Sequence, residues 1–297
     1  MSVNLHEGPP VDPEEAFFSL YRKCGDNDAT IRMFRTIIWE YYHSSARPMA
    51  WRETTDPYCI YVSEVMLQQT QVERVSAKYP EFIAAFPDFS SLAEAPLPTI
   101  LRVWQGMGYN RRAKLMKAAA GRVVSEFGGR LPRDVDTLRT FPGLGPATAA
   151  SIAAFAFNTP VVFIETNIRR VFIHFFFGER ENVADSEILP LVERSLDWIN
   201  PREWYYALMD YGTMLKQKVK NPNLRSRAYK RQSAFEGSSR QVRGKILRIL
   251  LDEGPTDMGT IIGKVADEMG RTETIIKELI AEGFLEAGNN GTIHIHE

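Results

Sequence analysis

The 297-residue sequence contains only two cysteines, no long hydrophobic run and almost no net charge. Cys24 and Cys59 cannot supply the four thiolates of an iron–sulfur cluster or a zinc ribbon, and we expect both to be free, buried thiols. No apolar stretch is long enough to span a bilayer and no signal peptide is recognisable, which predicts a cytoplasmic protein without membrane contact. Because the formal charge is −1, any surface for nucleic acid must arise from an uneven distribution of charge.

Strand patterns and internal repeats are also missing from the first 240 residues, which predicts an all-helical body. Residues 1–12 are polar and typical of a loose N-terminal arm. After this arm, apolar residues recur at helical spacing. The spacing predicts two helices within residues 14–45, then helices over 58–71, 72–86 and 91–105, one that ends at 127, and two more over 185–199 and 204–215.

A glycine-rich turn separates two helical runs in the middle of the chain. It reads PGLGP at residues 142–146, where the prolines forbid helix and Gly143 and Gly145 can adopt positive φ. An apolar helical run follows at once, with Thr148 and Ser151 near its start. This is the pattern of a helix–hairpin–helix, whose bare backbone N–H groups can approach a phosphate at a helix N-terminus.

Two glutamates stand in apolar surroundings. Glu165 interrupts an apolar stretch and is followed by Asn167, Arg169 and Arg170. A hairpin that binds anions, then a lone carboxylate, then two arginines indicates chemistry on nucleic acid. Glu64 lies within the helix expected over residues 58–71, and on that segment alone a solvated surface acid is the more frequent outcome.

The last third of the chain changes character twice. Residues 216–245 hold ten Lys or Arg side chains against a single acid, Glu236, which favours phosphate contact over a solvated linker. The tail then predicts helices over 242–252, 258–269 and 272–282, followed by a β-hairpin around residues 289–291. This is the order of a winged helix. The helix over 272–282 is acidic, which favours a structural role or a protein partner over the reading of bases.

Taken together, these segments resemble the helix–hairpin–helix DNA glycosylases related to endonuclease III, and within them the MutY-type adenine glycosylases. The similarity covers about residues 47–215. The run SEVMLQQT at residues 63–70 is the most specific part of it. The other matching segments are AWR at 50–52, GMGY at 106–109, FPGLG at 141–145 and ALMDYG at 207–212.

The resemblance implies a fold and a domain plan. The fold is mainly α, a two-lobed glycosylase domain over residues 13–215. Its central helical module covers about 57–165, and its second lobe combines 13–56 with 166–215. A basic linker over 216–241 stands where the iron–sulfur loop of the family lies, and a winged-helix-like domain follows over 242–297.

The resemblance also implies the site residues. Glu64 would protonate the departing base and help to place water, while Glu165 would stabilise the positive charge on the sugar. Gln69 would fill the gap left by the flipped base. The base pocket would be lined by Trp51, Arg52, Leu67, Ala147, Asn167 and Tyr206. DNA contacts would come from Gln68, Gln69, Thr70, Gly108, Tyr109, Asn110, Arg111, Gly143, Leu144, Gly145, Ala147, Thr148, Arg169, Lys216 and Arg240.

No cofactor is expected beyond a structural K⁺ or Na⁺ held by the backbone of Phe141 and Gly143. The chain departs from the family pattern in several places. Glu165 replaces the usual aspartate, and Ala147 replaces the lysine of the strand-cleaving relatives, which excludes lyase chemistry through that position. Asn110 replaces a tyrosine that the family uses against the opposite base. The cluster cysteines and the domain that reads 8-oxoguanine are missing.

These features lead to three hypotheses. The first is a monofunctional glycosylase that removes a mispaired adenine from duplex DNA. The second is removal of thymine or uracil opposite guanine, or of hypoxanthine, on the same scaffold. The third, from another class, is a non-catalytic protein that binds damaged DNA or regulates repair. Glu64 favours a purine because it needs a ring nitrogen to protonate, whereas Ala147 weakens that argument. We expect a monomer that is associated with the nucleoid.

Overall fold

The computed structural model describes residues 12–231, 234–266, 270–288 and 290–296 of the chain. Contacts within the chain group the residues into two compact units. Unit 1 comprises Met1–Pro48 and Ala153–Lys230, and unit 2 comprises Met49–Ile152 and Arg231–Glu297. The boundary falls inside helix α9 (Pro146–Phe157), whereas the resemblance placed it near residue 165. Residues 231–297 group with the helical module.

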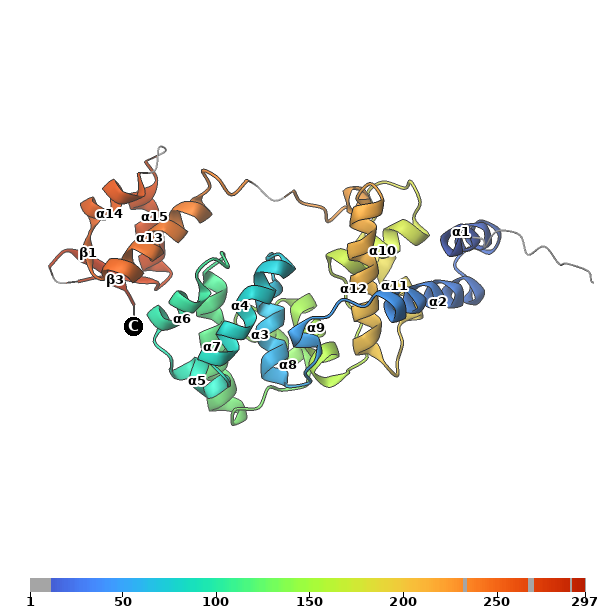
Figure 1. Ribbon diagram of the computed structural model, residues 1–297, viewed down its shortest axis with the longest axis horizontal. Coiled ribbons are helices and arrows are strands. Elements are labelled where there is room, and N and C mark those ends of the chain that lie inside the picture. The colour runs from blue at the N-terminus through green and yellow to red at the C-terminus, as the bar shows by residue number, and fades with distance from the viewer. Residues whose placement is uncertain (1–11, 232–233, 267–269, 289, 297) are drawn as a thin grey trace, which may run out of the picture. The chain divides into compact units, whose positions relative to one another are not determined.

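Unit 1 is built around an aromatic core. Phe17, Phe34, Phe175 and Phe176 are buried, and the ring centroids of Phe17 and Phe175 lie 4.9 Å apart at 89°. Edge-to-face packing of this kind adds to the burial of apolar area. The elements are α1 (Pro13–Cys24), α2 (Asp28–Ser45), α10 (Thr166–Phe176), α11 (Asp185–Ser195), α12 (Pro201–Lys218) and η2 (Pro222–Arg225), drawn in Figure 1.

The helical part of unit 2 confirms the predicted run of helices with two corrections. The helix expected over 58–71 ends at Leu67, and Gln68 continues in a turn. The helix expected over 91–105 is two helices, because Ala95 precedes Pro96 and is extended, as residues before proline usually are. The elements are η1 (Ala50–Arg52), α3 (Pro57–Leu67), α4 (Val72–Ala85), α5 (Phe89–Glu94), α6 (Leu97–Trp104), α7 (Arg111–Phe127) and α8 (Val135–Arg139).

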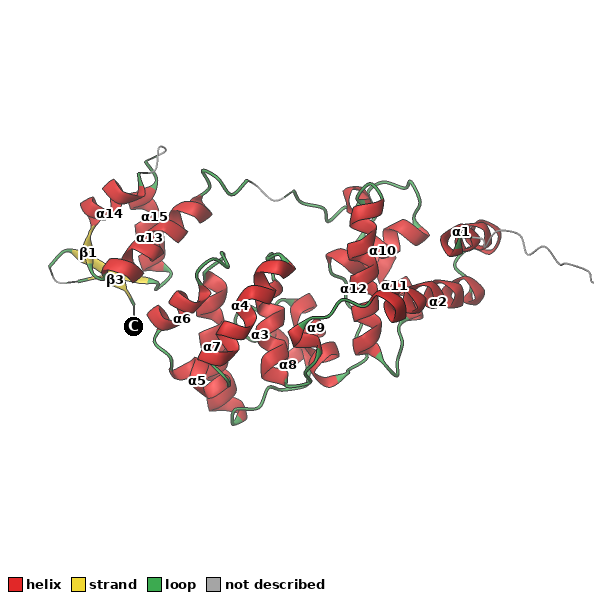
Figure 2. Cartoon of the chain, in the orientation of Figure 1, coloured by secondary structure: helices red, strands yellow, loops and turns green. Residues whose placement is uncertain are grey.

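The C-terminal part of unit 2 has the predicted order of three helices and a hairpin, plus a short strand that the sequence did not predict. Figure 2 shows this small sheet. Its order is β1-β3-β2, and both pairings are antiparallel. The second helix was expected to reach residue 269, but it ends at Val265, and residues 267–269 lie outside the described ones. The elements are α13 (Ser239–Glu253), β1 (Thr256–Asp257), α14 (Met258–Val265), α15 (Thr272–Ala281), β2 (Leu285–Ala287) and β3 (Thr292–Ile295).

The prediction of two buried thiols is wrong. Cys24 and Cys59 are free, but Cys24 is exposed and Cys59 is partly exposed. Cys24 is the last residue of α1, and its neighbours Arg22, Lys23 and Gly25 are exposed too. Among the described residues, no helix is long and apolar enough to cross a membrane. In the same residues, no group of three His, Cys, Asp or Glu side chains could hold a metal ion.

Candidate active site

Glu64 lies in α3, a helix that is almost entirely buried. Asp56 caps its N-terminus by accepting hydrogen bonds from the backbone N–H groups of Tyr58 and Cys59, and Pro57 occupies the first turn. Ser63, Val65 and Met66 around Glu64 are buried, while Glu64 itself is partly exposed. The reading of Glu64 as a solvated surface acid is therefore wrong.

The hydroxyl of Ser151, in α9, lies 2.6 Å from Oε2 of Glu64 and 3.0 Å from the carbonyl oxygen of Thr148. A hydroxyl has one proton to donate and two lone pairs to accept with. When Glu64 is ionised, Ser151 can donate to the carboxylate. When Glu64 carries a proton, Ser151 can accept from it and donate to Thr148 instead. The pair therefore keeps its contact in both protonation states.

The buried Arg112 stabilises the turn after α3 through hydrogen bonds from its guanidinium group. One guanidinium nitrogen, Nη1, donates to the carbonyl oxygens of Val65, Met66 and Gln68 at 2.9, 2.8 and 2.7 Å. The other, Nη2, donates to Oγ1 of Thr70 at 2.8 Å. The group thereby caps the C-terminus of α3 and fixes the turn in which Gln69 is exposed with a φ of 56°.

The same guanidinium also supports the turn at 106–110. Nη2 of Arg112 lies 3.1 Å from the carbonyl oxygen of Gly108, and Tyr109 follows with a φ of 47°. Burial lowers the pKa of Arg112 to about 10, so the group stays charged at neutral pH. In the described part of the chain no carboxylate pairs with it. Arg112 is thus a buried positive charge compensated by carbonyl dipoles, directly beneath two turns that carry predicted DNA contacts.

The helix–hairpin–helix is present as predicted, between α8 and α9. Gly143 adopts a φ of 81°, and a Cβ there would lie 3.1 Å from Cβ of Leu115, so both conformation and space favour glycine. Nε2 of Gln68 donates to the carbonyl oxygen of Gly143 and lies equally near Oγ1 of Thr148, at 3.2 Å each. The N–H groups in the first turn of α9, at Ala147 and Thr148, have no intrahelical acceptors and can meet a phosphate.

Glu165, in unit 1, is the N-cap of α10. Its Oε1 accepts from the backbone N–H groups of Asn167 and Ile168 at 2.6 and 2.8 Å. The backbone of Glu165 is extended, as is usual for an N-cap residue. Burial raises the pKa of Glu165, while the two amides, Arg170 and Arg169 act in the opposite direction and favour the ionised form.

A close approach of α12 to α10 fixes the start of α10. A Cβ on Gly212 would lie 2.5 Å from the carbonyl oxygen of Asn167, so only glycine fits. Nη1 of the buried Arg170 donates to the carbonyl oxygen of Gly212 at 2.6 Å and to Oδ1 of Asn167 at 2.7 Å. The final glycine of the ALMDYG segment therefore allows α12 to pack closely against the start of α10, which follows Glu165.

Other predicted site residues have structural partners. Trp51 is buried with its ring edge-on to Tyr79, and the buried Tyr206 stacks on Phe155 with centroids 4.5 Å apart. The guanidinium of Arg169 forms a two-pronged pair with Asp185 at 2.7 and 2.6 Å. Arg52, Leu67, Asn110 and Arg240 are partly exposed, and Ala147, Arg111 and Lys216 are exposed. Their assigned roles stay predictions.

Sequence reasoning missed Ser151, Arg112 and Gly212 as supporting residues of the site. Ser151 was visible as a lone hydroxyl in the apolar run TAASIAAFAF at 148–157, three residues after Thr148. Arg112 and Arg111 are adjacent, and nothing in the sequence distinguishes the buried one from the exposed one. Gly212 was part of a matching segment, but only the structure shows that the lack of a side chain allows the backbone of Asn167 to approach it closely.

The family model described as "HhH-GPD superfamily base excision DNA repair protein" matches residues 62–191. The adenine DNA glycosylase of Mycolicibacterium smegmatis (strain ATCC 700084 / mc(2)155) is 31% identical over 274 residues, which cover 86% of this chain and 93% of that protein. The chain belongs to the HhH-GPD superfamily of base excision DNA repair proteins. The resemblance inferred from SEVMLQQT and FPGLG is thereby confirmed.

Two further relatives differ in coverage. The adenine DNA glycosylase of Buchnera aphidicola subsp. Baizongia pistaciae (strain Bp) is 32% identical over 190 residues, and this chain spans 53% of its length. A solved structure described as a thermostable thymine-DNA glycosylase superposes with a TM-score of 0.60 at 27% identity, covering 65% of this chain and 90% of that one. The mainly helical glycosylase fold is thus confirmed.

The family implies two bound groups, an iron–sulfur cluster and a monovalent cation, and the residues of this chain suit only the second. An iron–sulfur cluster does not fit, because Cys24 ends α1, Cys59 lies inside α3 and the sequence has no other thiol. A monovalent cation at the hairpin would use the carbonyl oxygens of Phe141 and Gly143. These accept hydrogen bonds from the N–H of Leu144 and from Gln68, and each carbonyl keeps a second lone pair. The cation therefore stays a prediction.

Proposed function

We propose that this chain is a monofunctional DNA glycosylase that flips a mispaired base out of duplex DNA and hydrolyses its N-glycosidic bond. Adenine is the first substrate to test, because an adenine DNA glycosylase is similar to this chain over 86% of its length. The contact between Glu64 and Ser151 is the observation that carries the proposal. It gives a partly exposed carboxyl group a partner for each of its two protonation states.

The proposed reaction begins with protonated Glu64 donating its proton to a ring nitrogen of the base. Protonation makes the base a better leaving group, and the bond between sugar and base breaks as positive charge develops on the sugar. Ser151 then donates to the ionised carboxylate and holds it in place. Glu64 in this form can take a proton from the water that attacks the sugar, which returns the proton and closes the cycle.

Glu165 is proposed to act as a fixed negative charge that stabilises the cationic sugar. Two backbone amides orient one of its oxygens, and Nδ2 of Asn167 lies 3.3 Å from the other. A charge that is positioned before the reaction stabilises the transition state without the cost of reorganising solvent. The raised pKa of Glu165 implies that this charge disappears at acid pH.

The exposed Gln69 is proposed to enter the stack where the flipped base was, and the start of α9 to bind a phosphate. Ala147 carries no amine, so no covalent imine with the opened sugar can form at that position and the product would keep an intact strand. A second candidate, removal of thymine or uracil opposite guanine, is favoured by the similarity to the thymine-DNA glycosylase structure.

A single-turnover assay on a panel of duplexes tests the proposal. The panel holds A:8-oxoG, A:G, T:G, U:G and hypoxanthine duplexes, and alkaline strand scission reports base release. We expect release from an adenine mispair, no scission without alkali, and a loss of about 10²- to 10⁴-fold in Glu64→Gln. Glu73→Gln, at an exposed acid in α4, is the matched control and should act as the wild type.

Two outcomes would overturn this function. Release from T:G or U:G alone would favour the second candidate. No release from any duplex, together with tight binding to them, would indicate a non-catalytic protein that binds damaged DNA.

A further inference from the structure

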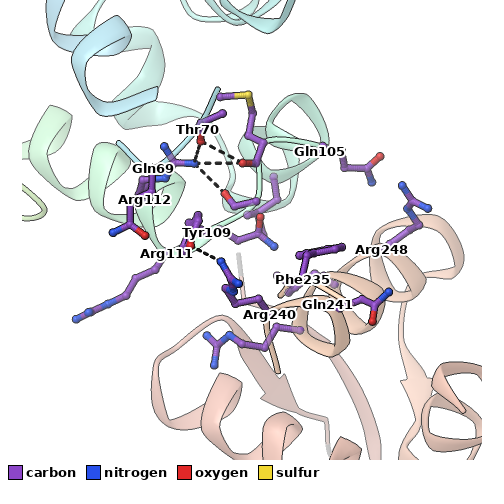
Figure 3. A pocket seen from close by; sticks show the side chains of 18 of the residues that line it. Gln69, Thr70, Gln105, Tyr109, Arg111, Arg112, Phe235, Arg240, Gln241 and Arg248 are labelled. Carbon is purple, nitrogen blue, oxygen red and sulfur yellow. Dashed lines mark hydrogen bonds between the residues drawn. The ribbon is translucent and has the colours of Figure 1, made fainter. Parts of the chain in front are cut away.

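Unit 2 contains a large cavity, of about 1000 Å³, whose lining is strongly basic. One wall comprises the turns at 68–71 and 106–112, and the other comprises α13 and the segment before it (Figure 3). Among the described residues that line it, seven are Lys or Arg and one, Glu282, is an acid. A concave surface with this balance raises the local concentration of anions.

The two walls are joined by contacts within unit 2. Nζ of Lys114, in α7, donates to the carbonyl oxygen of Gly283 at 2.9 Å and lies 5.3 Å from the ring centroid of Phe284. The guanidinium of Arg240 contacts the hydroxyl of Tyr109, and its Cζ lies 5.1 Å from that ring (Figure 3). The basic helix α13 is thereby attached to the turn that carries the predicted DNA contact Tyr109.

The cations of the cavity fall into two groups. Arg243 is neutralised by Glu282, with Nη1 to Oε1 at 3.0 Å, and Lys245 lies 3.4 Å from the carbonyl oxygen of Val265. The guanidinium groups of Arg74, Arg111 and Arg248 are exposed and have no hydrogen-bond or ion-pair partner within residues 12–231, 234–266, 270–288 and 290–296. These three charges come from three different helices, α4, α7 and α13.

Helix α15, where a winged helix usually carries its recognition residues, is not part of this basic wall. Its Glu278 lies 3.6 Å from Arg243, and its only Lys or Arg, Lys277, pairs with Glu273 at 2.7 Å. The acidic edge of α15 thus supports α13 instead of opposing a phosphate. The charge of the C-terminal part is presented by α13.

We propose that this cavity binds the phosphodiester backbone of duplex DNA, so that the C-terminal part of unit 2 grips DNA through α13 and not through α15. The inference rests on the proposed function only in taking DNA as the substrate. One exposed aromatic ring accompanies the charges, since Phe235 is 59% exposed and lines the cavity beside Arg240. A basic surface of this kind suits the phosphates of a duplex.

The test measures the affinity of the full chain for an undamaged duplex as a function of salt. In the double variant Arg74→Gln/Arg248→Gln we expect the Kd to rise by about tenfold or more. The slope of log K against log salt should fall by about 0.9 for each phosphate that the variant no longer neutralises. Lys277→Gln is the control, because Lys277 is exposed on α15 outside the cavity, and its Kd and slope should stay unchanged. Both variants change exposed side chains, so folding is retained.

An unchanged Kd and slope in the double variant would overturn the proposal, and so would an equal loss in Lys277→Gln. Because an undamaged duplex is used, the result does not depend on base release. A chain that releases no base but loses affinity in the double variant would refute the proposed function and support this surface. A chain that releases adenine and shows no change in the double variant would support the proposed function and refute this surface.

Discussion

The two candidate glutamates lie in different units and in opposite chemical settings. Glu64 is an interior residue of a buried helix and touches a hydroxyl that can donate or accept. Glu165 begins a helix, where burial raises its pKa while two backbone amides and two nearby arginines act in the opposite direction. One setting offers a partner for either protonation state, and the other holds a carboxylate whose charge is favoured by amides and arginines against the cost of burial.

This difference bears on the prediction that Glu165 stands in place of the aspartate expected from the resemblance. A capping carboxylate must reach the amides two and three residues ahead, and Glu165 does so from an extended backbone. The side chain of Asn167 in turn accepts a hydrogen bond from Nη1 of Arg170. The longer side chain is therefore compatible with a fixed anion, and the predictions below test whether the two glutamates are as different as their surroundings.

Apart from Glu64→Gln, the largest effect should come from removing the charge of Glu165. In Glu165→Gln the amide oxygen can still cap α10, so the fold is kept, while the charge opposite the cationic sugar is removed. We expect single-turnover base release to fall by about 10²- to 10³-fold, the usual cost of one preorganised electrostatic contact. Unfolding temperature serves as the control and should change little. Retention of full activity would show that Glu165 is only a helix cap.

A smaller effect should follow from disturbing the seat of Glu165. In Gly212→Ala the new Cβ would meet the backbone of Asn167 at 2.5 Å, so α10 or α12 must shift. We expect a loss of stability of about 1–3 kcal/mol, as for other overpacked sites, with reduced base release. Thermal unfolding provides the measurement.

The matched control for Gly212→Ala is Gly121→Ala, inside α7. A Cβ at Gly121 would meet nothing within 4 Å, so this change should stabilise the protein by about 0.5–1 kcal/mol through the better helix propensity of alanine. The two glycine variants should thus shift the unfolding temperature in opposite directions. A shift in the same direction would contradict the close approach of α10 and α12.

The smallest effect should come from Ser151→Ala. This variant removes the hydroxyl that holds Glu64 but leaves the carboxyl group, so we expect base release to fall by about tenfold, equivalent to about 1.4 kcal/mol. Ser125→Ala, at an exposed serine of α7, is the control and should have no effect. A loss as large as that of Glu64→Gln would mean that Ser151 itself takes part in the chemistry.

Much of the fold could be predicted because its signals are local. The prolines and glycines of PGLGP fix the hairpin, and helical spacing locates α7 to its last residue. Boundaries set by long-range packing could not be predicted. The end of α3, for example, depends on Arg112, which lies 46 residues beyond Met66 in the sequence. The same holds for the short strand β1, which exists only because it pairs with β3.

The candidate site shows the same division. Its two carboxylates were found through the motifs around them. The residues that decide what each carboxylate can do were not found, because Ser151 and Gly212 act across space on elements distant in sequence. A sequence can thus point to candidate residues before it shows which contacts hold them.

The pH dependence of single-turnover base release tests the contrast between the two carboxylates most directly. The pKa of Glu165 is raised from its ordinary value of 4.5, so protonation removes its charge as pH falls. The effect on folding has the opposite sign: the protonated form stabilises the fold at low pH, and this contribution is lost as pH rises through the raised pKa. We predict that base release by the wild type falls on the acid side with a midpoint above 4.5, and that the residual rate of Glu165→Gln lacks this fall. An acid limb that persists unchanged in Glu165→Gln would contradict the account.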